Sequence, residues 1–198
     1  DLPSFPTRRS SDLIVGRYID LVYSVALRQA GGDHHRAEDI TQAVFTDLAR
    51  KAGGAGGPLR DQPCHLGGWL HRHTCYVASN VRRTDQRRLA REETAAAMST
   101  LHPQPDPGWQ QVSACLDASI EDLPSADREA LVLRFYERLD LRAVGRHLGV
   151  SDDAAQKRVS RALERLRELL VARGVTLSVG ALATLVAEHA VSAAPAGL

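Results

Sequence analysis

The stretch from Leu148 to Arg167, LGVSDDAAQKRVSRALERLR, constrains the fold more than any other part of the chain. A glycine ends one apolar helical pattern, Ser151 starts another, and two acids occupy the first turn of the helix that follows. Serine is a favoured helix N-cap, and acidic side chains stabilise the positive end of the helix dipole. The stretch therefore predicts a helix-turn-helix, a motif whose second helix often enters the major groove of DNA.

The helix that begins after Ser151 has two unlike sides. Its apolar side would pack inward and carries Ala155, Val159, Ala162, Leu163, Leu166 and Leu170. Its polar side carries Lys157, Ser160 and Arg161, flanked by Gln156 and Arg158. Arginine and lysine pair with phosphates or guanine edges, and glutamine can pair with adenine. We therefore predict that the polar side binds DNA; the alternative is an ordinary helical hairpin with a solvated basic face.

Composition favours helices in the rest of the chain too. The 198 residues suffice for one ordinary domain or two small ones, and 43% hydrophobic with 25% charged residues is typical of a soluble globular protein. Strand-like alternation of branched residues is almost absent, while alanine, leucine and arginine dominate, so we predict an all-α fold. The formal net charge is +1, so any basic function must come from local clustering.

Apolar residues at helical spacing divide the chain into two small helical domains. The predicted helices span residues 14–28, 34–52, 66–91, 116–121, 125 to about 137, 141–148 and 151–173. The predicted N-caps are Asp33, Ser125, Asp140 and Ser151. Three prolines, at positions 103, 105 and 107, mark a polar stretch that is typical of a flexible interdomain linker. We expect a first domain over residues 14–92, a linker over 93–112 and a second domain over 113–173.

The two ends of the chain differ from these domains. Residues 1–13, DLPSFPTRRSSDL, have no apolar core segment and resemble the translation of a sequencing-adapter oligonucleotide. We interpret them as a non-native tail, with a natural disordered tail as the alternative. Residues 174–198 form an apolar extension whose uncharged run ends at Glu188, which is shorter than the roughly 20 residues of a membrane span. We expect a short helix that docks on the body or in a partner's groove.

A second basic run lies near the end of the third predicted helix. It comprises Arg82, Arg83, Arg87, Arg88 and Arg91, opposed by the single acid Asp85. Upstream on the same helix lie Trp69, His71, Arg72, His73 and Tyr76. Aromatic rings beside arginines suit stacking on exposed bases as well as phosphate pairing. For Trp69 considered alone, a place in the core is the better interpretation.

Two basic helical units joined by a proline-bearing segment resemble a sigma-70 family RNA polymerase sigma factor of the extracytoplasmic-function (group 4) type. These proteins have two domains, sigma2 and sigma4, and the resemblance covers nearly everything from Ile14 to Arg173. AEDITQAVFTDLARKA resembles the region 2.2 helix, and GWLHRHTCYVASNVRR resembles regions 2.3 and 2.4. LPSADREALVLRFYERLDLRAVGRHLGVSDDAAQKRVSRALERLR resembles region 4.

The resemblance implies three binding surfaces. The core polymerase surface, which would dock on the beta-prime clamp helices, comprises Asp39, Gln42 and Thr46. The −10 promoter surface comprises Trp69, Arg72, Tyr76, Asn80, Arg82, Arg83 and Arg87. The −35 surface comprises Ser151, Gln156, Lys157, Arg158, Ser160 and Arg161. The family usually has an acid at the position of Ala43, so one docking contact does not carry over. It often has Asn at the position of Tyr76 and Asp at that of Asn80, so the −10 sequence preference does not carry over either.

The same resemblance implies the binding partners of the protein and its subcellular localisation. Core RNA polymerase, through its beta-prime clamp helices and beta flap, and promoter DNA are expected, and an anti-sigma factor is a further partner that the family allows. No cofactor and no small-molecule substrate is expected, and the chain is predicted not to be an enzyme. Cys64, Cys75 and Cys115 are irregularly spaced and cannot form a paired disulfide framework, which favours reduced thiols in the cytoplasm.

Two rival interpretations remain open. Cys64, His65, His71, His73 and Cys75 have metal-ligand chemistry, but their spacing matches no usual zinc pattern, so no metal site is predicted. The stronger rival is a helix-turn-helix transcriptional regulator that binds DNA without acting as a polymerase subunit. Such a regulator would not need the polar face that Asp39 and Gln42 share.

Overall fold

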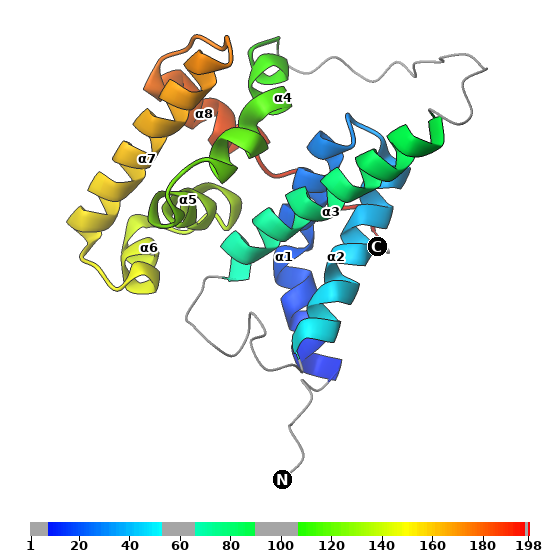
Figure 1. Ribbon diagram of the computed structural model, residues 1–198. Helices are drawn as coiled ribbons and strands as arrows, with labels where there is room; N and C mark the ends of the chain where they lie inside the picture. The colour runs from blue at the N-terminus through cyan, green and yellow to red at the C-terminus, as the bar shows by residue number, and fades with distance from the viewer. Residues whose placement is uncertain (1–7, 53–65, 90–106, 197) are drawn as a thin grey trace.

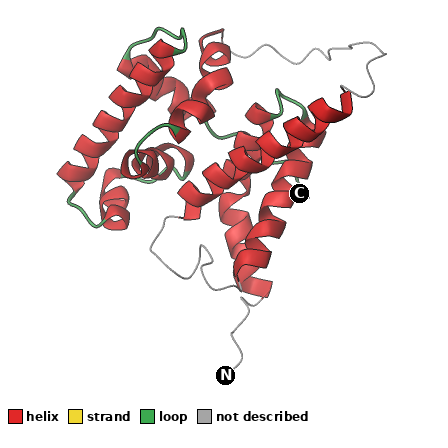
Figure 2. Cartoon of the chain, viewed as in Figure 1, coloured by secondary structure: helices red, strands yellow, loops and turns green. Residues whose placement is uncertain are grey.

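The computed structural model describes residues 8–52, 66–89, 107–196 and 198, and every regular element in those ranges is a helix (Figure 2). The predicted all-α class is therefore confirmed. The chain forms two helical halves that lie against each other (Figure 1).

The first half consists of α1 (Arg8–Gln29), α2 (His34–Ala52) and α3 (Leu66–Leu89), which pack on one another. Its core includes Val22 and Val25 from α1, Val44 from α2 and Leu70 from α3. Helix α1 begins six residues before the predicted Ile14, because no proline or glycine interrupts residues 8–13. The non-native origin of residues 1–13 stays a prediction, and residues 1–7 lie outside the described part.

The second half contains α4 (Pro107–Glu121), α5 (Ser125–Leu131), η1 (Val132–Tyr136), α6 (Leu141–Leu148), α7 (Asp152–Ala172) and α8 (Val179–His189). Helix α4 begins nine residues before the predicted start at Leu116, so residues 107–112 of the predicted linker are helical. Pro107 is compatible with this start, since the first turn of a helix tolerates proline, and Trp109 and Val112 are buried. Residues 93–106 of the predicted linker lie outside the described residues.

The predicted N-caps are mostly confirmed. Side-chain oxygens of Asp33, Asp140 and Ser151 accept backbone N–H bonds from residues three positions later, at 3.0, 2.7 and 3.3 Å. The prediction for Ser125 is wrong, because Pro124 occupies the N-cap and Ser125 is the first residue of α5. Helix α5 then continues into η1, whose π-type hydrogen bonding includes a bond from Glu137 N to Val132 O at 2.9 Å.

The C-terminal extension forms a short helix docked on the body, as expected. Leu182 and Val186 of α8 are buried, and α8 packs on α7 and α4. The chain after α8 returns to the first half and ends there (Figure 1). Within the described ranges, no helix has the length and apolar character that a membrane span requires.

The two halves share a continuous core rather than a solvated boundary. The N-terminal part of α3 lies against α5 and η1, and the C-terminal part of α1 lies against α4. A Cβ atom at Gly67, in the first turn of α3, would collide with the Glu137 side chain from the second half. The sequence gives no signal for this close approach.

Candidate nucleic-acid interface

The turn between α6 and α7 depends on two glycines. Gly149 ends α6 in the left-handed region, with φ of 65°, which glycine adopts at little cost. Gly145 lies buried in α6, where a Cβ atom would be only 2.8 Å from the backbone oxygen of Val150. Glycine at this position therefore lets α6 approach the turn closely. The turn at Gly149 is predicted by the sequence, whereas the role of Gly145 is not, although a glycine inside a short helical pattern is a signal for it.

Helix α7 presents the polar side that the sequence predicts. The six predicted inward residues, Ala155, Val159, Ala162, Leu163, Leu166 and Leu170, are all buried. Gln156, Lys157, Ser160 and Arg161 are exposed, and Arg158 is half-buried. Ser151 caps the helix, and Asp152 pairs with Arg142 at 3.5 Å. The first turns of α7 thus combine a fixed start with free basic side chains, which suits insertion into a DNA groove.

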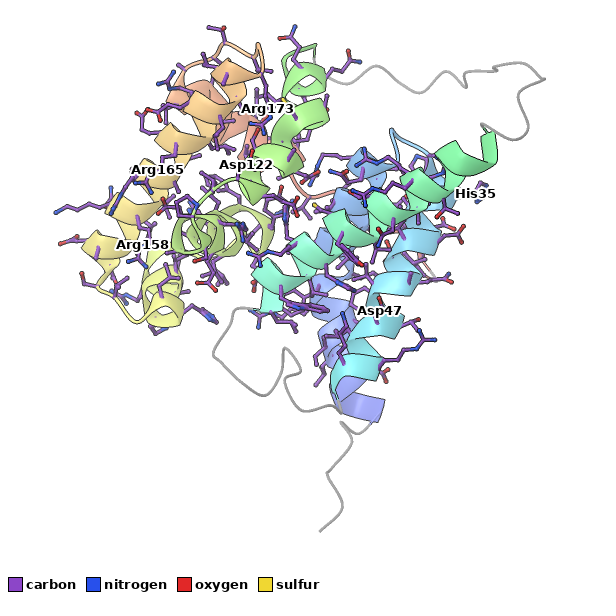
Figure 3. All side chains as sticks on the ribbon, viewed as in Figure 1. His35, Asp47, Asp122, Arg158, Arg165 and Arg173 are labelled. Carbon is purple, nitrogen blue, oxygen red and sulfur yellow. The ribbon has the colours of Figure 1, made fainter. Side chains whose placement is uncertain are left out.

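The arginines further along α7 serve the fold instead. Arg165, two turns after Arg158, pairs with Asp127 of α5, and Arg173, the residue that follows α7, pairs with Asp122 at 2.5 Å (Figure 3). These pairs connect α7 to α5 and to the end of α4. The basic character of the helix therefore divides into an exposed N-terminal part and a C-terminal part that is used within the protein.

A second surface lies on α3 and is built around three aromatic rings. Trp69 and His73 stack with centroids 4.6 Å apart, and His73 and Tyr76 stack at 6.0 Å. Lys51 Nζ lies 5.6 Å from the centroid of Trp69, within the range of a cation–π interaction. Tyr76 is 60% exposed at the open end of this column, so its ring has a free face for a further stacking partner.

His73 is held in place by α2. Its Nε2 atom lies 3.1 Å from an oxygen of Asp47, which Figure 3 labels on α2. Burial lowers the pKa of His73, and the hydrogen bond to Asp47 opposes this effect only in part. The ring is therefore neutral over a wider pH range than a free histidine, which keeps the aromatic column uncharged.

A cavity of about 460 Å³ opens on this face of α3. It brings together five of the predicted −10 residues, namely Trp69, Arg72, Tyr76, Asn80 and Arg83. Arg82 points elsewhere and donates to Gln29 Oε1 at 3.0 Å. Arg87 belongs to α3, but its side chain lies outside the described part. One wall of the cavity comes from Glu121 of α4, a neighbour that the sequence does not predict.

The opposite face of α3 is buried against the second half. His71 is fully buried, and its Nε2 atom lies 3.2 Å from Asp117 Oδ1. His71 is thus unavailable for base stacking or metal binding at the surface, whereas Cys75, although 4% exposed, is among the residues that line the α3 cavity. Among the described residues, no group of three or more side chains could hold a metal ion, and Cys64 and His65 lie outside those residues.

Asp117 is the centre of a buried polar cluster between the halves. Arg28 Nε and Nη2 each donate to one of its oxygens at 2.9 Å, and the Tyr136 hydroxyl donates at 3.4 Å. Burial alone would raise the pKa of Asp117, but the Arg28 guanidinium and the His71 ring more than offset it and hold that pKa well below its usual range. Sequence reasoning missed this cluster, because Arg28 and Asp117 are 89 positions apart.

The predicted polymerase-docking residues lie together on α2. Asp39, Gln42 and Thr46 are exposed, while Ile40, Val44 and Leu48 on the other side of the helix are buried, as is typical of an amphipathic helix. The exposed face also includes Ala43.

A capped α7 with an exposed basic start, set after a left-handed glycine turn, defines the class of helix-turn-helix DNA-binding proteins. Residues 113–166 match the family model described as Sigma-70, region 4. RNA polymerase sigma factor CarQ of Myxococcus xanthus is 33% identical over 138 residues, which cover 68% of this chain and 74% of the relative. The chain therefore belongs to the sigma-70 family of RNA polymerase sigma factors, in the extracytoplasmic-function group.

Two further comparisons complete this picture. ECF RNA polymerase sigma factor SigE of Mycolicibacterium smegmatis is 32% identical over 167 residues, which cover 81% of this chain. The match spans 62% of the SigE relative, less than two thirds of its length. A solved structure of the sigma factor RpoE with the anti-sigma factor NepR from Bartonella quintana matches 80% of this chain and 96% of that chain, with 20% identity and a TM-score of 0.33.

Proposed function

We propose that this chain directs core RNA polymerase to specific promoters and helps to open the DNA at transcription initiation. The observation that carries the proposal is the pair of separate DNA-type surfaces, on α3 and on α7, in a chain of this family. A regulator with one helix-turn-helix needs only the α7 surface. The second surface combines arginines with an exposed ring, which suits unpaired bases.

Each surface has a distinct role in this proposal. The exposed start of α7, with Gln156, Lys157 and Arg161, reads the −35 element as duplex DNA. The α3 cavity takes bases of the non-template strand of the −10 element once they leave the stack, and Tyr76 offers its free ring face to them. No covalent chemistry is asked of the protein, which binds and orients the strand.

Core polymerase completes the mechanism. Neither surface needs to bind promoter DNA tightly alone, because a partner that holds both halves turns two weak contacts into one multivalent contact. The exposed face of α2, with Asp39, Gln42 and Thr46, docks on the beta-prime clamp helices, and the second half docks on the beta flap. The third partner of the protein in this proposal is an anti-sigma factor that masks one of these surfaces. The protein acts in the cytoplasm.

In vitro transcription with purified core polymerase and a library of genomic fragments tests the proposal. We expect the chain to bind core polymerase and to produce discrete start sites. The variant Asp39→Lys reverses one charge on the docking face and should weaken core binding about tenfold or more. Glu188→Lys is the matched control, because it makes the same charge change on an exposed residue of α8.

The outcome also separates the two candidate functions. A chain that binds promoter DNA but never core polymerase would be a free-standing helix-turn-helix regulator, and the sigma assignment would be wrong. Core binding that survives Asp39→Lys unchanged would contradict the assignment of the α2 face alone.

A further inference from the structure

The segment that follows α8 connects the two halves of the protein. We call residues 190–196 the strap; it leaves the second half and lies along α1 (Figure 1). The Ser192 amide donates to Ser24 Oγ at 2.7 Å, and the Ala194 amide donates to Asp20 Oδ1 at 2.8 Å. The Ser24 hydroxyl also lies 3.0 Å from the Ser192 carbonyl oxygen, and Ser24 itself is 2% exposed.

The other end of the strap is fixed to the second half. Helix α8 precedes it directly and is buried through Leu182 and Val186 against its neighbours. His189, the last residue of α8, lies with its ring centroid 5.3 Å from that of Trp109 on α4. The strap is therefore attached to both halves. The halves cannot separate unless the strap loses its hydrogen bonds to α1 or α8 loses its packing on the second half.

The strap shares an arginine with the buried cluster between the halves. Arg28 Nη1 donates to the carbonyl oxygen of Ala190 at 2.7 Å, while the same guanidinium grips both oxygens of Asp117. The interface and the strap are thus one hydrogen-bonded network, in which the loss of one contact weakens the rest. A second pair, Arg17 to Glu137 at 2.8 Å, joins the halves near the middle of α1.

The closed arrangement places an acid in the −10 surface. Glu121, at the end of α4, lines the same α3 cavity as Arg72 and Arg83. A carboxylate there repels DNA phosphates and competes with them for the arginines. The α2 docking face, in contrast, stays exposed, so core polymerase can bind the closed protein first.

The size of the protein also indicates that the two halves must separate before both promoter elements can be bound. Promoter elements about 25 base pairs apart are separated by about 85 Å along B-form DNA, at 3.4 Å per base pair. A compact chain of this length has a radius of gyration of only about 16 Å. Halves that stay packed together therefore cannot reach both elements at once.

We propose that the strap holds the protein in a closed, autoinhibited state in which the Glu121 carboxylate of α4 lines the cavity of the −10 surface, and that release of the strap opens the protein for promoter binding. This inference rests on the proposed function for the identity of that surface. It assigns the C-terminal extension a regulatory role in this chain.

The test loosens the strap at one atom in the full chain. Ser192→Pro removes the amide that donates to Ser24 Oγ, while Ser192→Ala keeps the backbone bonds and is the matched control. Small-angle scattering reports the radius of gyration, and fluorescence anisotropy reports binding to a labelled, mixed-sequence single-stranded 20-mer. We expect Ser192→Pro to expand the protein and to bind the oligonucleotide about threefold to tenfold more tightly, since the open fraction sets the apparent affinity. Ser192→Ala should behave as the parent.

A second variant guards against local misfolding at Ser192. Asp20→Ala removes the acceptor of the Ala194 amide from the exposed surface of α1, and it should shift both readouts in the same direction. If neither variant expands the protein or tightens oligonucleotide binding, the strap inference is wrong. Expansion without tighter binding would equally overturn it, because Glu121 would then not oppose DNA binding at the α3 cavity.

The strap and the sigma assignment can fail separately. Scattering and oligonucleotide binding require no polymerase, so they decide on the strap by themselves. Core binding and start-site selection by the parent chain decide on the proposed function. Unchanged scattering in a chain that still directs core polymerase would refute the strap alone.

Discussion

The two DNA-type surfaces differ in what makes them available. The α7 surface depends on residues close together in the chain, from the Asp140 cap through the Gly149 turn to the buried stripe of α7. The α3 surface depends on residues distant in the sequence, because Glu121 of α4 lines its cavity and Asp117 of α4 contacts His71 on the buried side of α3. A local motif thus builds one surface, while packing between the halves supplies part of the lining of the other.

The largest expected effect concerns the contact behind α3. Asp117→Ala leaves the buried guanidinium of Arg28 without its partner, which should lower the free energy of unfolding by about 3–5 kcal/mol. Asp122→Ala is the control, because its pair with Arg173 is exposed and worth no more than about 1 kcal/mol. Urea denaturation measures both. Equal, small losses would mean that the halves are not held together by this cluster.

The same carboxylate makes stability depend on pH. The pKa of Asp117 in the folded protein lies below its value of about 3.9 in an unfolded chain, so its contribution is complete above that pH and declines as the pH falls through the folded pKa. We expect the unfolding free energy of the parent to fall more steeply below about pH 4 than that of Asp117→Asn. Parallel curves over that range would contradict the shift.

The next effect distinguishes the two groups of arginines on α7. Arg161→Ala should weaken binding to a −35 duplex by about 1–3 kcal/mol and reduce the salt dependence of that binding. Arg165→Ala should leave DNA affinity nearly unchanged, because its guanidinium pairs with Asp127 within the protein. Titrations at two salt concentrations measure both variants. Equal losses would show that the division along α7 has no functional meaning.

The smallest expected effect concerns the turn. Gly145→Ala forces a Cβ against the Val150 carbonyl, and about 1–3 kcal/mol of strain should outweigh about 1 kcal/mol of improved helix propensity. Gly16→Ala in α1 meets open space and should be neutral or stabilising. Thermal unfolding compares the two variants. A stabilised Gly145→Ala protein would mean that the turn relaxes without cost.

The sequence predicted what depends on neighbours in the chain and missed what depends on distant ones. Helical periodicity identified the buried stripe of α7, and cap chemistry identified Asp140 and Ser151. The sequence did not predict the start of α4 at Pro107, because a proline can begin a helix as well as prevent one. The buried residues Trp109 and Val112 were therefore assigned to the linker. The DNA-facing roles of the predicted residues stay predictions.

For the α3 site, the sequence identified the residue types but not their surroundings. Periodicity could not show that Arg82 turns toward Gln29 while Arg83 lines the cavity, since both positions are exposed. Nor could it pair Arg28 with Asp117, because a charged residue at the edge of an apolar stripe is expected at the surface. Only the packing of one half on the other decides these contacts.

The guanidinium of Arg28 donates hydrogen bonds to two distant parts of the chain, the carboxylate of Asp117 on α4 and the carbonyl oxygen of Ala190 just after α8. Exchange of either half with that of a related protein would therefore strand a buried charge, even if each transplanted helix folded well. Hybrid sigma factors made from this chain should tolerate a new recognition surface on α7 far better than a new α4. In hybrids that misassemble, replacing residues 28 and 117 together, with a pair that matches, should restore the packing of the two halves.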